Sequence, residues 1–283
     1  MAALSTFDGS LMNGTKSRAF ALLELLVVIS VIALLMAILV PALGAARSGS
    51  RALACKSNLR QLLLASIGYA TEHDGFFVPA ASDLWRNAGL SRWHGRRESL
   101  DDRFDPLKGP LVAYLADGKI RECPAKVDFV SGKSWKTNFE QGCGGYGYNM
   151  TYIGSRLWQS GIDSLQDFKD SYVNTTRVTE IARPGQTLMF ADSAMANDER
   201  YVIEYSFAEP PFTVFEGKPM TGFYTSPSIH FRHSDTASIG WADGHVSPRR
   251  MASLDNENIY GVRSADMKLG WFDPIDNTPF DLE

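Results

Sequence analysis

Residues 20–40 read Phe-Ala-Leu-Leu-Glu-Leu-Leu-Val-Val-Ile-Ser-Val-Ile-Ala-Leu-Leu-Met-Ala-Ile-Leu-Val, and this stretch decides the architecture. A helix of about 20 apolar residues is long enough to cross a hydrocarbon core of roughly 30 Å. Lys16 and Arg18 lie just before the run. Because cationic residues are enriched on the cytoplasmic side of membrane spans, we predict a cytoplasmic N-terminus and a single span.

A secretory signal peptide is the alternative interpretation of the same run. Its apolar region is usually shorter, and small residues follow it at the cleavage site. The run here is long, yet Ala42, Gly44 and Ala46 supply small residues beyond it. Cleavage near residue 47 would release a freely secreted protein.

Glu24 is the only charged residue inside the apolar run. A carboxylate at the centre of a bilayer costs on the order of 3 kcal/mol, and less near an interface. Glu24 lies near the start of the run, so an interfacial acid is one interpretation. The other is a buried charge that meets the free amine of a neighbouring subunit in a filament.

The stretch from Arg18 to Ile29 resembles the cleavage signal of type IV prepilins and type II secretion pseudopilins. The resemblance implies that a prepilin peptidase cuts between Ala19 and Phe20 and methylates the new amine. Glu24 stands where the family has its glutamate, and Pro41 where many members have a helix-bending proline. The family usually has Gly before the cut, where this chain has Ala19.

The helical pattern continues beyond the apolar run. Residues 45–72 carry a stripe of apolar side chains at helical spacing, with polar side chains on much of the other side. The stripe consists of Leu53, Leu59, Leu62, Leu63, Ile67 and Ala70. Pro41 should kink or locally open the helix, because it lacks a backbone donor and clashes with the preceding turn. We expect the helix to stop at His73-Asp74-Gly75, with Gly75 as its cap.

The chain after residue 75 alternates short apolar runs with turn residues, which predicts an irregular β-containing head. The expected strands are 187–191, 201–205, 237–242 and 245–248. Residues 85–97 combine Trp and Arg, so this patch either stacks on a sugar or packs its rings on the head. A net charge of −4 excludes a broad nucleic-acid footprint, and no nucleophile has an evident partner, so we expect no enzyme.

The segment from His233 to Val246 contains a His, nine residues and then Asp243-Gly244. It resembles the H-X9-DG segment of a large pilin-like family with prepilin-type N-termini. Asp-Gly between two apolar runs also predicts a hairpin with a type I′ turn, in which Ala242 pairs with His245.

A polar cluster is predicted around the same segment. Its members are Asp192, His233, Asp235, Asp243 and His245, and the first four are the possible metal ligands. Carboxylate oxygens suit Ca²⁺, and related major pseudopilins carry calcium in a C-terminal loop. No cofactor is established by the sequence. Cys55, Cys123 and Cys143 leave two pairings open, Cys55 with Cys123 or Cys123 with Cys143, or three buried thiols.

The predicted fold class is α+β and pilin-like, with a long N-terminal helix packed on an antiparallel sheet with long irregular loops. The expected parts are a leader at 1–19, a transmembrane half-helix at 20–43, an amphipathic half at 44–75 and a periplasmic-side head at 76–283. The chain would be an inner-membrane pseudopilin-like subunit of a type II secretion or type IV pilus-like assembly. Its partners would be the prepilin peptidase, other pilin-like subunits and the membrane, with no nucleic acid. The alternative is a stalk-anchored envelope protein that binds a glycan or Ca²⁺ without polymerising.

Overall fold

A computed structural model describes residues 22–86, 89–125, 127, 129–130, 140–197, 201–252, 257–258 and 260–283. Ala19 and Phe20, the predicted cleavage pair, lie outside these residues. The chain divides into two compact units, residues 1–46 and residues 47–283. The second unit is the head.

Helix α1 runs from Leu22 to Glu72 and contains Pro41 within it. Its described residues in the first unit, 22–46, have exposed side chains throughout. This stretch is long and apolar enough to cross a membrane. A helix is one of the few structures that can cross a bilayer, because it pairs nearly all of its backbone polar groups internally.

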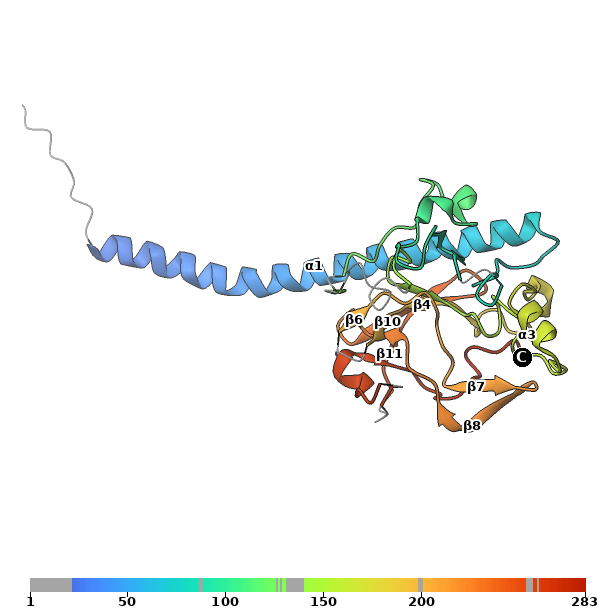
Figure 1. The fold of residues 1–283 in the computed structure, drawn as a ribbon. Helices are drawn as coiled ribbons and strands as arrows, with labels where there is room; N and C mark the ends of the chain where they lie inside the picture. The colour runs from blue at the N-terminus through green and yellow to red at the C-terminus, as the bar shows by residue number, and fades with distance from the viewer. Residues whose placement is uncertain are drawn as a thin grey trace, which may run out of the picture. The chain divides into compact units, whose positions relative to one another are not determined.

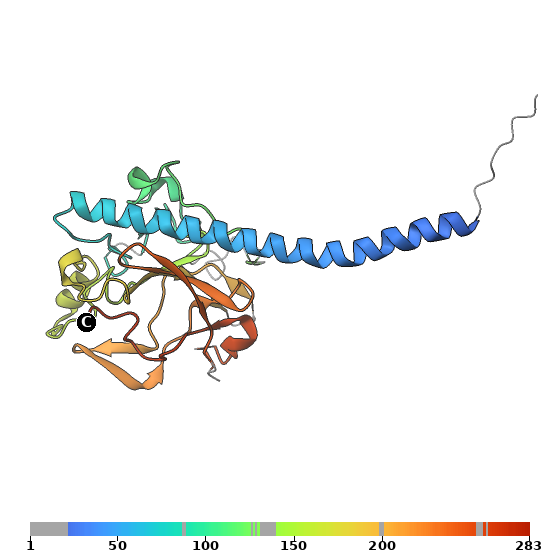
Figure 2. The ribbon, with the colours of Figure 1, turned by 180° about the vertical axis from the view of Figure 1, so that it is seen from behind.

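The part of α1 that belongs to the head is amphipathic. Leu59, Leu62 and Leu63 are fully buried, as the apolar stripe predicted, whereas Leu53 is 68% exposed and does not belong to the buried face. A Cβ on Gly240 would lie 3.0 Å from the Leu63 side chain, so the glycine lets the helix approach the sheet closely. Figures 1 and 2 show this part of α1 along one side of the head.

Helix α1 ends in the predicted glycine cap. The Gly75 backbone amide donates to the Ala70 carbonyl at 2.9 Å, and both Asp74 and Gly75 adopt positive φ. This bond satisfies one of the carbonyls that the last turn leaves without a helical partner.

The head is built on small antiparallel sheets, in agreement with an α+β class. The main sheet has the strand order β11-β10-β4-β3, and two-stranded pairs are β1-β2, β5-β6, β7-β8 and β9-β12. The bounds are β1 Ser91–Arg92, β2 Gly95–Arg96, β3 Tyr146–Tyr148, β4 Leu188–Asp192, β5 Met195–Ala196, β6 Val202–Ile203, β7 Phe212–Phe215, β8 Lys218–Tyr224, β9 Ile229–His230, β10 Thr236–Trp241, β11 Val246–Arg250 and β12 Leu269–Gly270.

Short helices fill the connections between the strands. They are η1 Pro106–Lys108, η2 Val112–Tyr114, α3 Leu165–Ser171, η3 Val178–Glu180 and η4 Ser264–Met267. Ser164 and Asp167 form a capping box at the start of α3, in which each side chain satisfies a backbone amide of the other residue. The predicted strands 187–191, 201–205, 237–242 and 245–248 all contain observed strand, with bounds that differ by up to two residues.

Only part of the tryptophan-arginine patch belongs to the core, since Trp85 is 52% exposed. The Trp93 ring is buried and its Nε1 donates to the Ser206 carbonyl at 2.7 Å. Arg92 is buried with Glu140, whose carboxylate lies 2.8 Å from the guanidinium. Packing on the head therefore accounts for these residues better than stacking on a sugar.

Candidate metal centre

Four side chains from distant parts of the head converge in its interior: Cys55, Cys123, Asp192 and His233. One ligand atom of each lies within 4.8 Å of the ligand atoms of the other three. Three of the residues are buried and Cys123 is partly buried. We refer to them below as the four-residue cluster.

Separate elements position the members of the cluster. Cys55 lies on the buried face of α1, and Asp192 is the last residue of β4. His233 lies in the turn between β9 and β10, where Ser234 and Asp235 adopt positive φ. Cys123 lies in the connection after η2, held by a bond of 2.9 Å from its amide to the Gly144 carbonyl. The site therefore exists only when the whole head is folded.

The Asp192 carboxylate is the main hydrogen-bond acceptor in the cluster. Its Oδ1 accepts from the Cys55 thiol at 3.0 Å, and its Oδ2 accepts from the Ser238 backbone amide at 2.7 Å. The same Oδ2 lies 3.4 Å from Nε2 of His233. A fully buried carboxylate needs such partners, because an isolated charge in the interior is strongly unfavourable.

The charges in the cluster are stabilised mutually. Contact with the Cys55 thiol lowers the pKa of Cys123 to about 5, and the His233 imidazole adds to this against the effect of burial. Contact with Cys123 and burial raise the pKa of Cys55. Burial works against the charge on His233, but Asp192 and Cys123 outweigh it and raise the pKa of His233 to about 9. Burial also opposes ionisation of Asp192, yet His233 and Arg232 hold its pKa below the ordinary value.

A single ring nitrogen of His233 faces both neighbours. Nε2 lies 3.4 Å from Sγ of Cys123 and 3.4 Å from Oδ2 of Asp192. In a nucleophile-histidine-carboxylate triad the ring uses one nitrogen for the nucleophile and the other for the carboxylate. The arrangement here does not have that relay geometry. Instead, two sulfur atoms, one nitrogen and one oxygen lie within 4.8 Å of one another, which is close enough for one metal ion to contact all four.

The structure brings together only part of the predicted metal cluster. Asp192 and His233 meet, but Asp235 lies outside the group and its carboxylate pairs with Lys268 at 3.1 Å. Asp243 pairs with His245 at 2.6 Å in the turn at the other end of β10, where both side chains are about half exposed. Asp243 does not join Asp192, because the six residues of β10 carry it roughly 20 Å from the end of the strand where His233 lies.

The hairpin at Asp243-Gly244 differs from the predicted two-residue turn. The Gly244 amide donates to the Trp241 carbonyl at 2.9 Å, and the Trp241 amide donates to the His245 carbonyl at 3.0 Å. Gly244 has a φ of 93°, and Asp243 does not adopt positive φ. The loop is therefore a three-residue turn with a glycine bulge rather than a type I′ turn that pairs Ala242 with His245.

The cysteines fall into two environments, and all three are free thiols. Cys55 and Cys123 both belong to the four-residue cluster. Of the two predicted pairings, the structure therefore favours Cys55 with Cys123 over Cys123 with Cys143. Cys143 is fully buried elsewhere, and burial raises the pKa of its thiol. The sequence indicated Cys55 and Cys123 as disulfide candidates and did not group them with Asp192 and His233.

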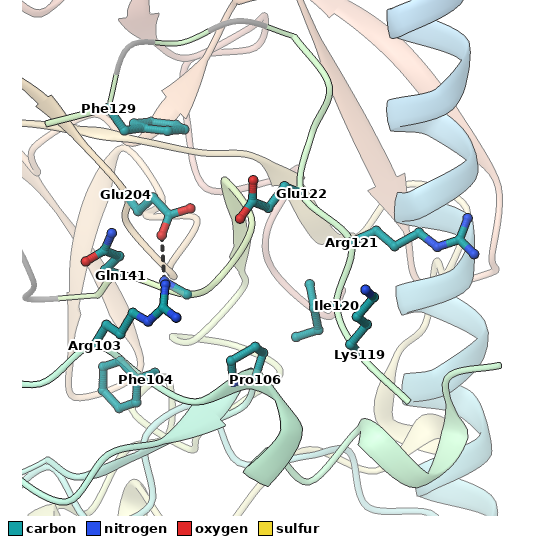
Figure 3. Close-up of a pocket in the computed structure, with 11 residues that line it drawn as sticks. Arg103, Phe104, Pro106, Lys119, Ile120, Arg121, Glu122, Phe129, Gln141 and Glu204 are labelled. Atoms are coloured by element: carbon teal, nitrogen blue, oxygen red, sulfur yellow. Dashed lines mark hydrogen bonds between the residues drawn. The ribbon is translucent and has the colours of Figure 1, made fainter. Parts of the chain in front are cut away.

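A separate polar pocket of about 580 Å³ opens in the head. Figure 3 shows Arg103, Glu122 and Glu204 around it, while the Arg121 side chain extends toward α1. Burial raises the pKa of Glu204, although the Gly142 amide donates to its carboxylate. The pocket offers both donors and acceptors to a polar ligand.

Comparisons of the chain with protein-family models, with curated proteins and with solved structures gave no match.

Proposed function

We propose that the chain is a membrane-anchored, pilin-like structural subunit whose α1 helix both spans the membrane and forms part of the core of the head. The observation that supports this most is α1 itself. It is a 51-residue helix that is apolar over residues 22–46 and carries a buried stripe over residues 55–70. A helix with these two halves serves as an anchor and as a scaffold for a folded domain.

Assembly through α1 follows from the proposal. Leu- and Val-rich helix surfaces in a membrane associate by van der Waals packing and by polar contacts between helices. The prepilin resemblance implies that Glu24 meets the Phe20 amine of a neighbouring subunit, which would pair two charges in an apolar surrounding. A type II secretion or type IV pilus-like filament is the assembly that fits this pairing.

The first test is the mature N-terminus of the native protein, read by mass spectrometry. The proposal expects a chain that begins with N-methylated Phe20 in the membrane fraction. A chain that begins at Met1, or near residue 47, would refute prepilin processing.

The second test reverses the charge of Glu24. Glu24→Lys should abolish crosslinked oligomers in the envelope while the head keeps its protease resistance. Glu98→Lys is the matched control, because Glu98 is an exposed acid of the head whose side chain is 83% exposed. Oligomers of normal abundance in Glu24→Lys would contradict assembly through this helix.

A second candidate function is a stalk-anchored binding protein that does not polymerise. The polar pocket around Arg103 and Glu204 favours it, because hydroxyl-rich ligands such as glycans need donors and acceptors together. Calorimetry of the full chain in detergent with a glycan panel tests this candidate. An absence of binding across the panel, together with methylated Phe20, would leave the subunit proposal alone.

A further inference from the structure

We propose that Cys55, Cys123, Asp192 and His233 bind one Zn²⁺ ion inside the head. The proposal rests on the geometry of the four-residue cluster and not on the assignment of the chain as a pilin-like subunit. A zinc ion here would be structural, since all four positions of a tetrahedron are supplied by protein side chains.

The distances in the cluster suit a tetrahedral ion. Zinc bonds of about 2.3 Å to sulfur and 2.0–2.2 Å to nitrogen or oxygen separate neighbouring ligand atoms by about 3.3–3.8 Å. Sγ of Cys55 lies 3.0 Å from Asp192 Oδ1, Nε2 of His233 lies 3.4 Å from Sγ of Cys123, and no pair exceeds 4.8 Å. Shifts of about 1 Å or less would therefore close the site around an ion.

The donor set selects zinc over the calcium that the sequence suggested. Calcium takes six to eight oxygen ligands, and this cluster offers oxygen only from Asp192. Two thiolates and an imidazole are ligands that favour zinc among the common redox-inert ions. Deprotonation of the two thiols on binding makes them anionic ligands.

Outer contacts hold the ligands in place. The Ser238 amide fixes Oδ2 of Asp192, and Oδ1, which accepts from the Cys55 thiol, becomes available to the metal when that thiol loses its proton. The Tyr146 hydroxyl faces Cys55 and accepts from Asn58 at 3.3 Å. Two thiolates and one carboxylate would give the zinc site a net charge of −1. The Arg232 guanidinium opposes that charge, because its positive charge acts on both Cys123 and Asp192.

A disulfide between Cys55 and Cys123 is the competing use of the same thiols. It would leave the buried His233 and Asp192 beside an uncharged bridge, and it would not explain why their side chains lie so close to the two sulfur atoms. The two states are mutually exclusive, because a disulfide sulfur is no longer a thiolate ligand. They are therefore distinguishable in one sample.

The experiment uses the full chain purified in detergent, stripped with a chelator under reducing conditions and reloaded with Zn²⁺. We expect one equivalent of zinc per chain by elemental mass spectrometry. Loading with Co²⁺ instead should give a sulfur-to-cobalt charge-transfer band and intense visible bands of a tetrahedral site. Less than a tenth of an equivalent of zinc, with Cys55 and Cys123 both alkylatable, would overturn the proposal. So would a Cys55–Cys123 disulfide in the native protein that leaves no metal bound.

Matched variants test the identity of the ligands. Asp192→Asn and His233→Gln should weaken zinc binding by at least about 100-fold, because loss of a ligand exceeds the 10–100-fold effect of an outer contact. Asp243→Asn and His245→Gln, the exposed pair, should keep the affinity of the unmodified chain. Tyr146→Phe should weaken binding by about 10-fold. Equal affinity in Asp192→Asn and Asp243→Asn would overturn the site. The cobalt spectrum of the unmodified chain decides the question if a ligand variant does not fold.

Discussion

Two carboxylate-imidazole pairs lie near the opposite ends of strand β10, and they differ in almost everything except their residue types. In the first pair, Asp192 has a side-chain exposure of 0% and His233 of 4%. In the second pair, Asp243 is 41% exposed and His245 is 49% exposed. The first pair is joined by two thiols, whereas the second lies at the tip of a hairpin.

The difference shows that residue type does not decide whether such a pair becomes a site. Water competes for both members of the exposed pair, so their attraction contributes about 0–1 kcal/mol. The buried pair has lost that water and depends on the groups around it, so any missing partner is costly. Only the buried pair has further ligands within reach, and only there can a metal ion be enclosed.

The largest expected effect is the stabilisation of the folded head by zinc, which should depend on the buried pair and not on the exposed pair. At a zinc concentration of about 1,000 times the dissociation constant, the free energy of unfolding should rise by about 4 kcal/mol, because the ion binds the folded state. Urea unfolding of the head in detergent, followed by tryptophan fluorescence, measures this. Asp243→Asn should gain the same amount and Asp192→Asn almost none. An equal gain in both variants would show that the stabilisation comes from elsewhere.

The next largest effect concerns a third carboxylate, that of Glu140, which is buried like Asp192 but is paired with Arg92. Burial alone would raise the pKa of Glu140, but the Arg92 guanidinium outweighs it and lowers the pKa to about 2. A glutamate in an unfolded chain has a pKa of about 4.3. The stabilisation from Glu140 is therefore complete above about pH 4.3 and is lost as the pH falls toward about 2, a change of about 3 kcal/mol.

Urea midpoints measured from about pH 5 down to about pH 2.5 test this acid limb. The exposed Asp243 provides the comparison, so Asp243→Asn should leave most of the decline in place. A stability that does not change over this range would contradict the assignment of Glu140 as a buried anion.

The smallest expected effect tests whether Asp243 and Gly244 serve only to form the hairpin turn. Gly244 has a φ of 93°, which an L-residue adopts only at a cost of about 1–2 kcal/mol. Gly244→Ala should therefore lower the free energy of unfolding by about 1 kcal/mol and leave zinc binding unchanged. Gly222→Ala is the control, because a Cβ there meets nothing within 4 Å and its φ is not positive. A loss of zinc binding in Gly244→Ala would place the hairpin tip in the site.

Most local features of this fold were predictable from the sequence. The extent of α1 follows from apolar length and helical spacing, and its end at Gly75 follows from the conformation that glycine permits. Three strands of the main sheet, β4, β10 and β11, were visible as short apolar runs between turn residues, whereas β3 was not predicted. Leu53 was assigned to the buried stripe by its spacing alone, but the core does not extend to that turn of the helix.

The candidate site was only half predictable, because its contacts are long-range. Asp192 and His233 were grouped through the polar segments around them, and Asp243 was added because it is near His233 in the sequence. A strand carries Asp243 away from His233, and no local pattern reports that. Cys55 lies 137 residues before Asp192, and Cys123 lies 110 residues before His233. The packing of α1 against the sheet brings the Cys55 sulfur to the acid, and the connection after η2 brings the Cys123 sulfur to the imidazole.

The same separations set an order of events during synthesis. Cys55 emerges soon after the apolar run, while Asp192 and His233 follow only when most of the chain has been made. The Cys55 thiol is therefore without its full set of final neighbours until His233 has been made. A chain that stops before His233 lacks one of the four side chains, so a complete cluster marks a chain that has been made at least as far as the turn between β9 and β10.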